Sequence, residues 1–518
     1  MSTLRGSLTY EPVELNFGTS GLRGLVVDMT DLECYLNTVG FLKFLETHDN
    51  LQPGATVYLA GDLRDSTPRI MQAVQAACED NGYKVVYLGL IPTPALALYA
   101  LKSRAPGIMV TGSHIPADRN GIKFYKSAGE VLKGDEAAIK ENVAAVRITI
   151  YNQAATDTQF DAQGFLKKTI NLPGQEKAAT TDFLNRFTTI FAPNTFQGKK
   201  IVFYQHSAVG RDLITDILIH LGAEVIPVGR SDVFIPIDSE NVTPEHKDYF
   251  RRLTKENPDC FAIISTDGDS DRPFVIDETG EFHRGDVLGA VVAAWLKADF
   301  AACTATTSDA ATDYLTAKQI DWEQTKIGSP YVVEAMIDAS AAGKLRPTGW
   351  EVNGGFMTGS QFKVNGQELP SLPTRDATLP ILVALIAALE ANLKISELFE
   401  ELPKRYTSFA QIGNFPTATA KAIVAHFSED NDQTRKELAK YFKKKNGFGQ
   451  IKSISTIDGV RILFASADVF HMRPSGNAPD FRAYSIADSQ SRADEIVALA
   501  IAEPDGLYRQ MEKSLLKT

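Results

Sequence analysis

The chain repeats one pattern of secondary structure three times, and this repeat restricts the fold more than any other feature. Each copy has a short apolar stretch rich in β-branched residues, then a helix-forming stretch, then a second strand. The copies begin near residues 55, 200 and 300, and the third is the weakest. Strands that alternate with helices imply right-handed crossovers and mainly parallel sheets. Three such units in succession predict three related α/β domains.

The repeated elements can be placed along the chain. In the first copy a helix begins at Ser66-Thr67-Pro68, where proline is tolerated in the first turn, and it stops at Asn81-Gly82. The expected strands are residues 55–60, 83–88, 200–204, 223–228 and 300–305, and the expected later helices are residues 212–220 and 309–317.

The last part of the chain has a different pattern. Residues 459–465 and 481–486 are expected to be strands around a turn, and residues 491–502 a helix, which fits a smaller α+β domain. A chain of 518 residues is also too long for a single core. We therefore expect four domains, over residues 1–158, 159–281, 282–403 and 404–518. Residues 152–194, rich in Gln, Thr and Ala, are expected to include a linker.

Charge and composition exclude several classes of partner. The net charge is −11 and there is no long basic run, so neither nucleic acid nor an anionic membrane is expected as the main partner. The four cysteines lack metal-ligand spacing and are expected to be reduced thiols. Residues 1–14 lack the apolar core of a signal peptide, and the apolar stretch 379–389 is too short to span a bilayer. We expect a cytoplasmic protein.

The first chemical motif is TGSHIPADRNGIKFY at residues 111–125. The apolar stretch 107–110 fits a buried strand, and it leads into a small turn that contains Ser113 and His114. A serine presented on such a turn is placed for covalent chemistry. The alternative is that Ser113 and His114 merely close a turn.

The second motif is an acidic loop that follows an apolar strand at residues 260–265. Asp267, Asp269 and Asp271 stand at alternate positions, and their carboxylates repel one another unless a cation lies between them. A hard divalent ion with oxygen ligands, Mg²⁺ above all, meets this need. An acidic hairpin turn is the alternative. An EF-hand is excluded because Arg272 stands at the sixth position, which requires glycine.

Four further loops contain groups that can bind anions or hydroxyls. Residues 17–24 have three glycines and Arg23, which can hold a phosphate with two hydrogen bonds. Residues 473–482 combine two arginines, a hydroxyl and an amide. Glu351 and Asn353 in residues 349–355 can hold two vicinal hydroxyls. Residues 325–329 include Lys326. Taken singly, each loop could be an ordinary turn or flexible segment.

Together, these stretches resemble the α-D-phosphohexomutases, the phosphoglucomutase and phosphomannomutase superfamily. Residues 111–125 are similar to its phosphoserine loop, 267–272 to its metal loop Asp-Gly-Asp-x-Asp-Arg, and 18–24 to its N-terminal loop. Residues 473–482 resemble its phosphate-binding loop, and 349–355 its sugar-binding loop. The chain departs from the family pattern at five positions, which are Ser329, Asn353, Gly355, Asn477 and Ala478. Two of these, Asn353 for serine and Gly355 for histidine, lie in the loop that contacts the sugar.

The resemblance implies a fold, an activity and a set of site residues. The implied fold has three related α/β domains with mixed sheets and a C-terminal α+β domain around a central cleft. The implied enzyme is a mutase that interconverts hexose 6-phosphate and hexose 1-phosphate through phosphorylated Ser113 and a hexose 1,6-bisphosphate, which also serves as activator. Its implied Mg²⁺ ligands are Ser113, Asp267, Asp269 and Asp271.

The remaining roles also come from the resemblance. The implied catalytic residues are Ser113, His114, Lys123 and Arg23, with Lys123 as a general base whose pKa is lowered by burial among cations. The implied substrate-binding residues are Arg272, Lys326, Glu351, Asn353, Arg473, Ser475, Gly476, Asn477 and Arg482.

Mannose phosphate is the favoured substrate, with glucose phosphate tolerated, because Asn353 offers both a donor and an acceptor. The only partner expected is a small sugar phosphate, and the protein is expected to be a monomer or a dimer. Two alternatives stay open. One is a metal-dependent sugar-phosphate phosphatase, and the other is a sugar-phosphate binding protein without catalysis.

Overall fold

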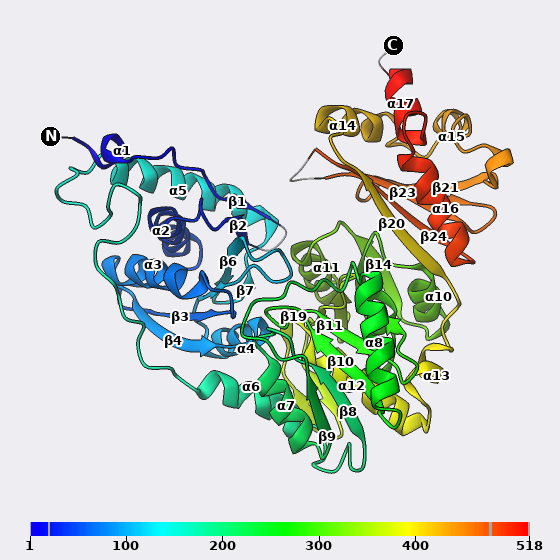
Figure 1. Ribbon diagram of the computed structural model, residues 1–518, viewed down its shortest axis with the longest axis horizontal. Helices are drawn as coiled ribbons and strands as arrows, with labels where there is room; N and C mark the ends of the chain where they lie inside the picture. The colour runs from blue at the N-terminus through cyan, green and yellow to red at the C-terminus, as the bar shows by residue number, and fades with distance from the viewer. Residues whose placement is uncertain (1, 19–20, 476–478, 516–518) are drawn as a thin grey trace. The chain divides into compact units, whose positions relative to one another are not determined.

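The computed structural model describes residues 2–18, 21–475 and 479–515. The chain divides into two compact units, one of residues 1–301 with 328–399 and one of residues 302–327 with 400–518. Figure 1 shows the helices and strands, coloured from blue at the N-terminus to red at the C-terminus.

The first sheet of the first unit is mixed. Its spatial order is β1-β2-β6-β5-β3-β4, with β7 beside β6. The strands are β1 (Asn16–Phe17), β2 (Leu22–Leu25), β3 (Thr56–Gly61), β4 (Lys84–Leu90), β5 (Gly107–Val110), β6 (Arg119–Lys126) and β7 (Gly129–Glu130). Strands β4, β3 and β5 are parallel, whereas β5, β6, β2 and β1 pair antiparallel. The expected parallel pairing thus holds for β3, β4 and β5, whereas β6, β2 and β1 are antiparallel.

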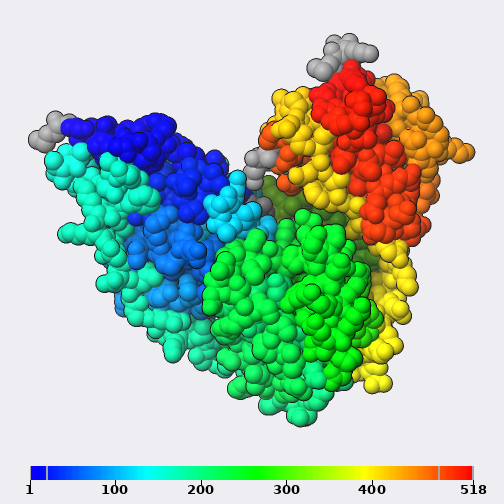
Figure 2. Space-filling view, viewed as in Figure 1, coloured from blue at the N-terminus to red at the C-terminus, as the bar shows by residue number. Residues whose placement is uncertain are grey.

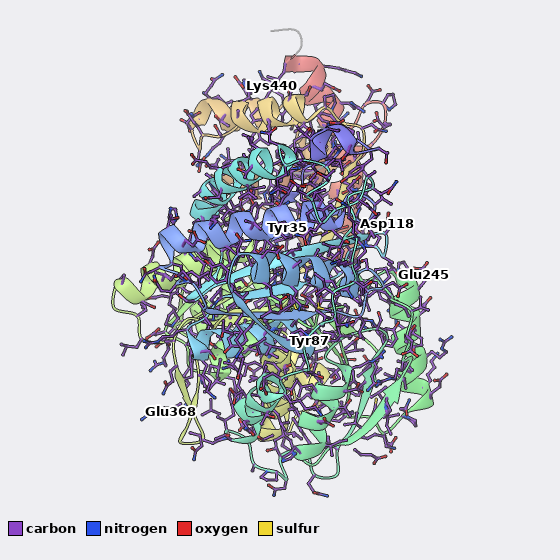
Figure 3. All side chains as sticks on the ribbon, turned by 90° about the vertical axis from the view of Figure 1, so that its left-hand side faces the viewer. Tyr35, Tyr87, Asp118, Glu245, Glu368 and Lys440 are labelled. Atoms are coloured by element: carbon purple, nitrogen blue, oxygen red, sulfur yellow. The ribbon has the colours of Figure 1, made fainter. Side chains whose placement is uncertain are left out.

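Helices cover both faces of this sheet. They include α1 (Leu4–Ser7), α2 (Asp31–His48), α3 (Thr67–Asp80), α4 (Thr93–Ser103) and α5 (Glu136–Tyr151). Leu59 of β3 packs with Ile70 of α3 in one core cluster, whereas the ring of Tyr58 lies 5.0 Å from that of Tyr99 in α4. Alternate residues of a strand face opposite sides, so α3 and α4 lie on opposite faces. Figure 3 labels Tyr35 on α2 and Tyr87 on β4.

The second sheet repeats the topology of the first. Its order is β12-β11-β10-β8-β9, from β8 (Lys200–Tyr204), β9 (Glu224–Val228), β10 (Ala262–Thr266), β11 (Pro273–Ile276) and β12 (Phe282–His283). Strands β9, β8 and β10 are parallel and β11 is antiparallel to β10, just as β6 is antiparallel to β5. The loops after β5 and β10 therefore occupy equivalent places, and these loops contain Ser113 and the three aspartates.

Three helices accompany the second sheet, α6 (Ala178–Thr188), α7 (Arg211–His220) and α8 (Pro244–Glu256). Thr243 caps α8, since its hydroxyl accepts from the backbone N–H of His246. Phe250 and Leu253 bury the apolar side of α8 in a cluster with Val202 of β8. Figure 2 shows this part of the chain, in green, at the molecular surface.

The remaining part of the first unit contains the sugar-loop strands. Strands β15 (Pro347–Trp350), β16 (Phe356–Thr358) and β19 (Leu372–Asp376) pair antiparallel, and β17 (Phe362–Val364) forms a hairpin with β18 (Gln367–Leu369). The helices are α9 (Gly285–Trp295), α11 (Ser329–Ala341), α12 (Thr378–Ala391) and α13 (Ile395–Phe399). Helix α12 is buried from Thr378 to Ala388, as its apolar sequence predicts. Strand β13 (Phe300–Thr304) crosses from the first unit into the second.

The second unit is an α+β structure, which confirms the prediction for the C-terminal part. It has a five-stranded antiparallel sheet of order β20-β24-β23-β22-β21. The strands are β20 (Tyr406–Ile412), β21 (Ile451–Ser455), β22 (Val460–Phe464), β23 (Val469–Pro474) and β24 (Phe481–Ala487), with β14 (Asp321–Thr325) elsewhere in the unit. The helices are α10 (Asp309–Ala317), α14 (Thr417–His426), α15 (Asp432–Leu438), α16 (Gln490–Ile501) and α17 (Leu507–Leu515).

Two other expectations can be compared with the fold. Within residues 152–194, Phe160 is buried against Tyr35 and α6 lies near the end of the segment, whereas residues 161–177 form no helix or strand. Across the described ranges, none of the helices combines the length and apolar character that crossing a membrane requires.

Candidate active site

Ser113 lies at the carboxyl end of β5, in the loop that leads to β6. Its side chain is 1% exposed, and its backbone is left-handed with φ of 55°. Non-glycine residues seldom adopt this conformation. The backbone N–H of Ser113 donates to Thr111 Oγ1 at 2.8 Å. The loop thus holds the serine in a backbone conformation that the surrounding structure must impose.

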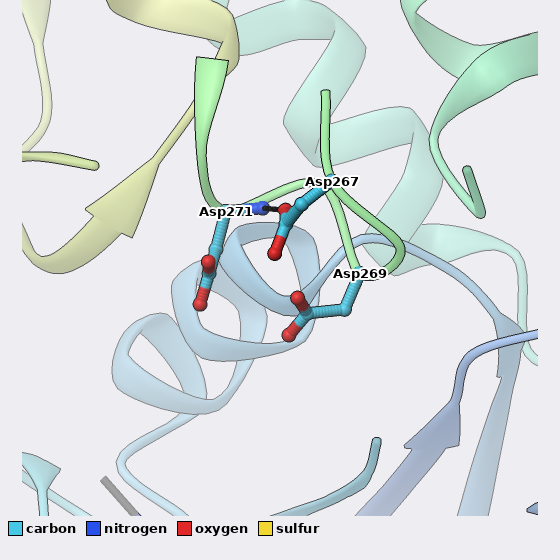
Figure 4. A group of neighbouring side chains, drawn as sticks. All are labelled: Asp267, Asp269 and Asp271. Carbon is cyan, nitrogen blue, oxygen red and sulfur yellow. Dashed lines mark hydrogen bonds between the residues drawn. The ribbon is translucent and has the colours of Figure 1, made fainter. Parts of the chain in front are cut away.

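The acidic loop meets this serine although 154 positions separate them in the sequence. Ser113 Oγ donates to Asp267 Oδ2 at 2.5 Å. Asp267 Oδ1 accepts from the backbone N–H groups of Asp271 and Arg272, both at 3.1 Å, and Figure 4 draws the first of these bonds. The carboxylates of Asp267, Asp269 and Asp271 offer oxygens within 4.8 Å of one another, and all three residues are buried. The predicted serine and aspartates therefore lie together.

The three carboxylates fit a hard divalent ion. Asp269 Oδ1 and Asp271 Oδ1 are buried and accept no hydrogen bond from any residue that the structure describes. Burial and the charges of Asp269 and Asp271 raise the pKa of Asp267 well above its ordinary value. A buried carboxylate oxygen without a donor is costly, and a cation with oxygen ligands such as Mg²⁺ would satisfy it.

Lys123 lies between two of these aspartates, and one expectation about it is wrong. Its Nζ donates to Asp269 Oδ2 and to Asp271 Oδ2, each at 2.6 Å. Burial alone would lower the pKa of Lys123, but the two carboxylates outweigh burial and raise it above the ordinary value. The sequence suggested neighbouring cations and a lowered pKa, whereas the nearest charges are anionic.

The pKa values of His114 and Arg23 are both lowered by their surroundings. Burial, followed by the charges of Arg272 and Arg23, lowers the pKa of His114 well below its ordinary value. His114 Nδ1 lies 3.4 Å from Ser113 Oγ. Arg23 belongs to β2, and burial together with Arg272 and Arg375 lowers its pKa to about 10.

The sugar loop joins β15 to β16 and is tied to the metal loop by Arg375. Arg375 Nη1 donates to Glu351 Oε2 at 2.7 Å. Its Nε and Nη2 both donate to Asp271 Oδ2, at 3.1 and 3.0 Å. A Cβ on Gly355 would come within 2.6 Å of the Arg375 stem, so glycine is required for this approach. Arg375 therefore occupies the space beside Gly355, where the family pattern has histidine.

The segment between β9 and α8 also reaches these loops. Arg272 Nη1 lies 3.1 Å from Asp238 Oδ1 and 3.6 Å from Glu240 Oε1. Asn353 Nδ2 donates to Glu240 Oε1 at 3.1 Å, and Asn353 Oδ1 accepts from the backbone N–H of Gly355 at 3.0 Å. The Asn353 amide, expected to bind the sugar, thus has protein partners at both ends.

The remaining predicted residues lie in the second unit. Arg473 Nε donates to Asp458 Oδ1 at 2.9 Å, and Asp458 Oδ2 accepts from the backbone N–H of Ile327, next to exposed Lys326. The loop of Lys326 and that of Arg473 thus share one carboxylate. Arg482 Nη2 lies 3.5 Å from Ser475 Oγ. Gly476 and Asn477, and the departure at Ala478, lie outside the described residues.

Several residues at the site belong to no motif. They are Asp62, Arg64, Thr93, Asp238, Glu240 and Arg375. Thr93 Oγ1 donates to Asp269 Oδ2 at 2.5 Å, and Arg64 contacts the Ser113 loop. A weak signal existed for Asp62 and Arg64, because both follow the end of β3, where polar groups of a parallel sheet collect. The others had none in the sequence.

Comparison with known proteins gives a consistent picture. Residues 14–148 match the family model for phosphoglucomutase/phosphomannomutase, alpha/beta/alpha domain I, and residues 284–406 match domain III. A phosphomannomutase of Sinorhizobium fredii is 39% identical over 488 residues, which cover 94% of this chain and 98% of that protein.

Two solved structures share the fold. A phosphoglucomutase/phosphomannomutase family protein of Burkholderia thailandensis superposes with a TM-score of 0.68 at 18% identity, covering 98% of this chain and 99% of that one. The N-acetylphosphoglucosamine mutase of Aspergillus fumigatus, solved with GlcNAc-6P and magnesium, has a TM-score of 0.52 at 12% identity, covering 99% and 98%.

Proposed function

Because the chain belongs to the phosphoglucomutase/phosphomannomutase family, we propose that it interconverts mannose 6-phosphate and mannose 1-phosphate through a phosphorylated Ser113. The enzyme is a mutase, hence an isomerase. The observation that carries the role of Ser113 is its 2.5 Å hydrogen bond to Asp267, one of three clustered carboxylates. Glucose phosphate is proposed as a second, poorer substrate.

The reaction needs two phosphoryl transfers. In the first, the bond between phosphorus and Ser113 Oγ breaks while phosphorus bonds to the free hydroxyl oxygen of the sugar, whose proton passes to a base. The product is the hexose 1,6-bisphosphate. After this intermediate turns around, its other phosphoryl returns to Ser113 Oγ and the sugar oxygen regains a proton. Such transfers depend mainly on in-line positioning and charge neutralisation.

The proposed metal is Mg²⁺, held by Asp267, Asp269 and Asp271 with an oxygen on Ser113. Held by these residues, Mg²⁺ would supply positive charge that neutralises phosphoryl oxygens. The fungal relative solved with magnesium and the unsatisfied oxygens of Asp269 and Asp271 support this assignment.

Proton transfer is proposed for Lys123 and Arg23. Lys123, held between two carboxylates, is placed to donate a proton, and Arg23 is the candidate base by its match to the family's N-terminal loop. His114, next to Ser113, is proposed to contact the phosphoryl group.

The sugar and its non-reacting phosphate have separate proposed partners. Glu351, Asn353 and Arg272 would hold the sugar side, and the residues of the second unit would hold the phosphate. The latter are Lys326, Arg473, Ser475, Gly476, Asn477 and Arg482. We also propose the four-domain division 1–158, 159–281, 282–403 and 404–518, and a hexose 1,6-bisphosphate activator.

Replacing the serine tests this function. We expect Ser113→Ala to lose mutase turnover while mannose 6-phosphate still binds, because the sugar contacts are unchanged. Intact-mass measurement of the purified wild-type protein should show one added phosphate, absent from the variant. Near wild-type turnover by Ser113→Ala would refute the assignment.

The assay also separates the alternatives. Mannose 1-phosphate is supplied with Mg²⁺ and a trace of the 1,6-bisphosphate, and both 6-phosphate and free phosphate are followed. A mutase forms sugar 6-phosphate without stoichiometric free phosphate. Release of phosphate alone would identify a phosphatase, and binding without either product would identify a binding protein.

A further inference from the structure

A buried ion pair lies against the Ser113 loop and belongs to none of the sequence motifs. Asp62 and Arg64 follow β3 directly, and Arg64 is only 2% exposed. Arg64 Nε donates to Asp62 Oδ2 at 3.2 Å. A buried guanidinium is costly unless its donors are paired.

The guanidinium uses all of its remaining donors on one loop. Arginine has five N–H donors in a rigid planar arrangement. The four that do not face Asp62 donate to backbone carbonyls of the phosphoserine loop. Nη2 donates to Ser113 at 2.9 Å and Ile115 at 2.6 Å, and Nη1 donates to Pro116 at 2.7 Å and Arg119 at 2.8 Å. A single side chain thus satisfies the carbonyls of a whole turn.

Asp62 connects to the backbone N–H of Ser113 through Thr111. Thr111 Oγ1 donates to Asp62 Oδ2 at 2.8 Å, and the same Thr111 oxygen accepts from the backbone N–H of Ser113. The carbonyl of Ser113 accepts from Arg64, which is paired with Asp62. The backbone N–H of Ser113 is therefore connected to Asp62 through Thr111, and its carbonyl accepts directly from Arg64.

The guanidinium is closely packed by its neighbours. Phe234, from the segment between β9 and α8, stacks on Arg64 with 3.9 Å between the guanidinium carbon and the ring centroid. A Cβ on Gly112 would lie 2.6 Å from the same carbon. A Cβ on Gly268, in the metal loop, would lie 2.6 Å from the Ser113 carbonyl and 2.9 Å from the Phe234 ring. The serine loop, Arg64 and the metal loop are thus in close contact.

We propose that Arg64 is a positioning residue for phosphoryl transfer. Held by Asp62 and Phe234, it keeps Ser113 in the left-handed conformation that aims Oγ at Asp267. The N–H donors of Arg64 are all used on Asp62 and on backbone carbonyls of the serine loop, so Arg64 acts through Ser113. The inference rests on the proposed role of Ser113 as phosphoryl carrier.

The test removes the guanidinium group by mutation and then supplies free guanidinium ion in solution. In Arg64→Ala we expect kcat to fall about 100-fold, since a small misplacement of a reacting group costs that much. Mannose 6-phosphate affinity, measured by calorimetry, should stay unchanged. Added guanidinium ion, at concentrations well below denaturing ones, should restore part of the rate by filling the space left by the side chain.

A second readout does not depend on activity. Hydrogen exchange followed by mass spectrometry should show faster exchange confined to residues 111–121 in Arg64→Ala. If wild-type protein has no mutase activity or no phosphate on Ser113, the proposed function fails, and the exchange data still decide whether Arg64 holds the loop.

The matched control is Arg186→Ala. Arg186 of α6 is also buried, its Nε lies 4.0 Å from Asp376 Oδ2, and its guanidinium donates to the backbone carbonyl of Pro370 rather than to the serine loop. It should leave exchange at residues 111–121 unchanged and show no rescue by guanidinium.

Arg64→Lys covers the case in which the alanine variant does not fold. It keeps the charge but loses the planar set of donors, and it should lose most of kcat while its circular dichroism stays native. Wild-type kcat in Arg64→Lys, or equal changes in Arg64→Ala and Arg186→Ala, would overturn the proposal.

Discussion

Ser113 shows how one residue acquires its environment from distant parts of the chain. Its left-handed backbone is held through Thr111 and Arg64, and its hydroxyl donates to Asp267, 154 positions away. The motif identifies the serine, but two of its hydrogen-bond partners, Arg64 and Asp267, come from separate segments of the chain. A change in either of them can therefore alter the serine without touching the motif.

Arg375, like Ser113, has hydrogen-bond partners that are distant in the sequence. It joins Glu351 of the sugar loop to Asp271 of the metal loop. We expect Arg375→Lys to lower kcat/KM by about 30-fold, or about 2 kcal/mol, because one ammonium cannot replace hydrogen bonds to two charged groups. Steady-state rates on mannose 1-phosphate measure the effect. Arg186→Lys is the control, and an equal loss there would contradict a specific role.

At the level of the elements, each of the three site loops follows the end of a β-strand. The Ser113 loop joins β5 to antiparallel β6, the aspartate loop joins β10 to antiparallel β11, and the sugar loop joins β15 to antiparallel β16. Each loop also contains a residue with positive φ, namely Ser113, Ser270 and Gly354. The serine, the three aspartates and the sugar loop therefore each follow a strand that pairs antiparallel with the next strand.

The turn after β8 gives the second sheet a pH-sensitive stability. Buried His206 donates from Nε2 to the carbonyl of Thr266 at 2.7 Å, and burial lowers its pKa to about 4. The unfolded chain, with a His pKa of about 6.5, binds more protons between pH 6.5 and 4. The free energy of unfolding should thus fall through this window as pH decreases, by up to about 3 kcal/mol.

Thermal unfolding of wild-type protein and His206→Gln at pH 7 and pH 5 checks this. We expect a smaller drop in the unfolding midpoint for the variant, whatever its stability at pH 7. His471 in the second unit, whose pKa burial also lowers to about 4, remains in both proteins as a common background. Equal drops would show that His206 does not cause the loss.

For the molecule as a whole, the clustered carboxylates connect metal binding to stability. The three buried aspartates lie close enough together to share a divalent ion, and a ligand that binds only the folded state stabilises it by mass action. At 100 times its dissociation constant, Mg²⁺ should add about 2.7 kcal/mol to the free energy of unfolding.

Scanning calorimetry with Mg²⁺ and then with excess chelator measures this shift, which removal of the metal should reverse. Asp269→Asn should lose most of the response to Mg²⁺. A full response in that variant would place the metal elsewhere.

The repeated α/β pattern, the C-terminal α+β structure and the mutase activity could be predicted from the sequence because their signals are local. Strand and helix periodicity lies within short windows, and Ser113 and the aspartates lie in compact motifs. The contacts that organise the site are not local. Arg64 meets Ser113 across 49 positions, and Arg375 meets Asp271 across 104.

These isolated residues become recognisable only when folding brings them to the loops. The same reason explains the wrong expectation for Lys123. Its charge neighbours, Asp269 and Asp271, come from the second sheet, so no stretch around position 123 could show that carboxylates, rather than cations, would govern its pKa. Short sequence motifs identify the reactive side chains. The electrostatic environment of each group arises from segments that meet only in the folded protein.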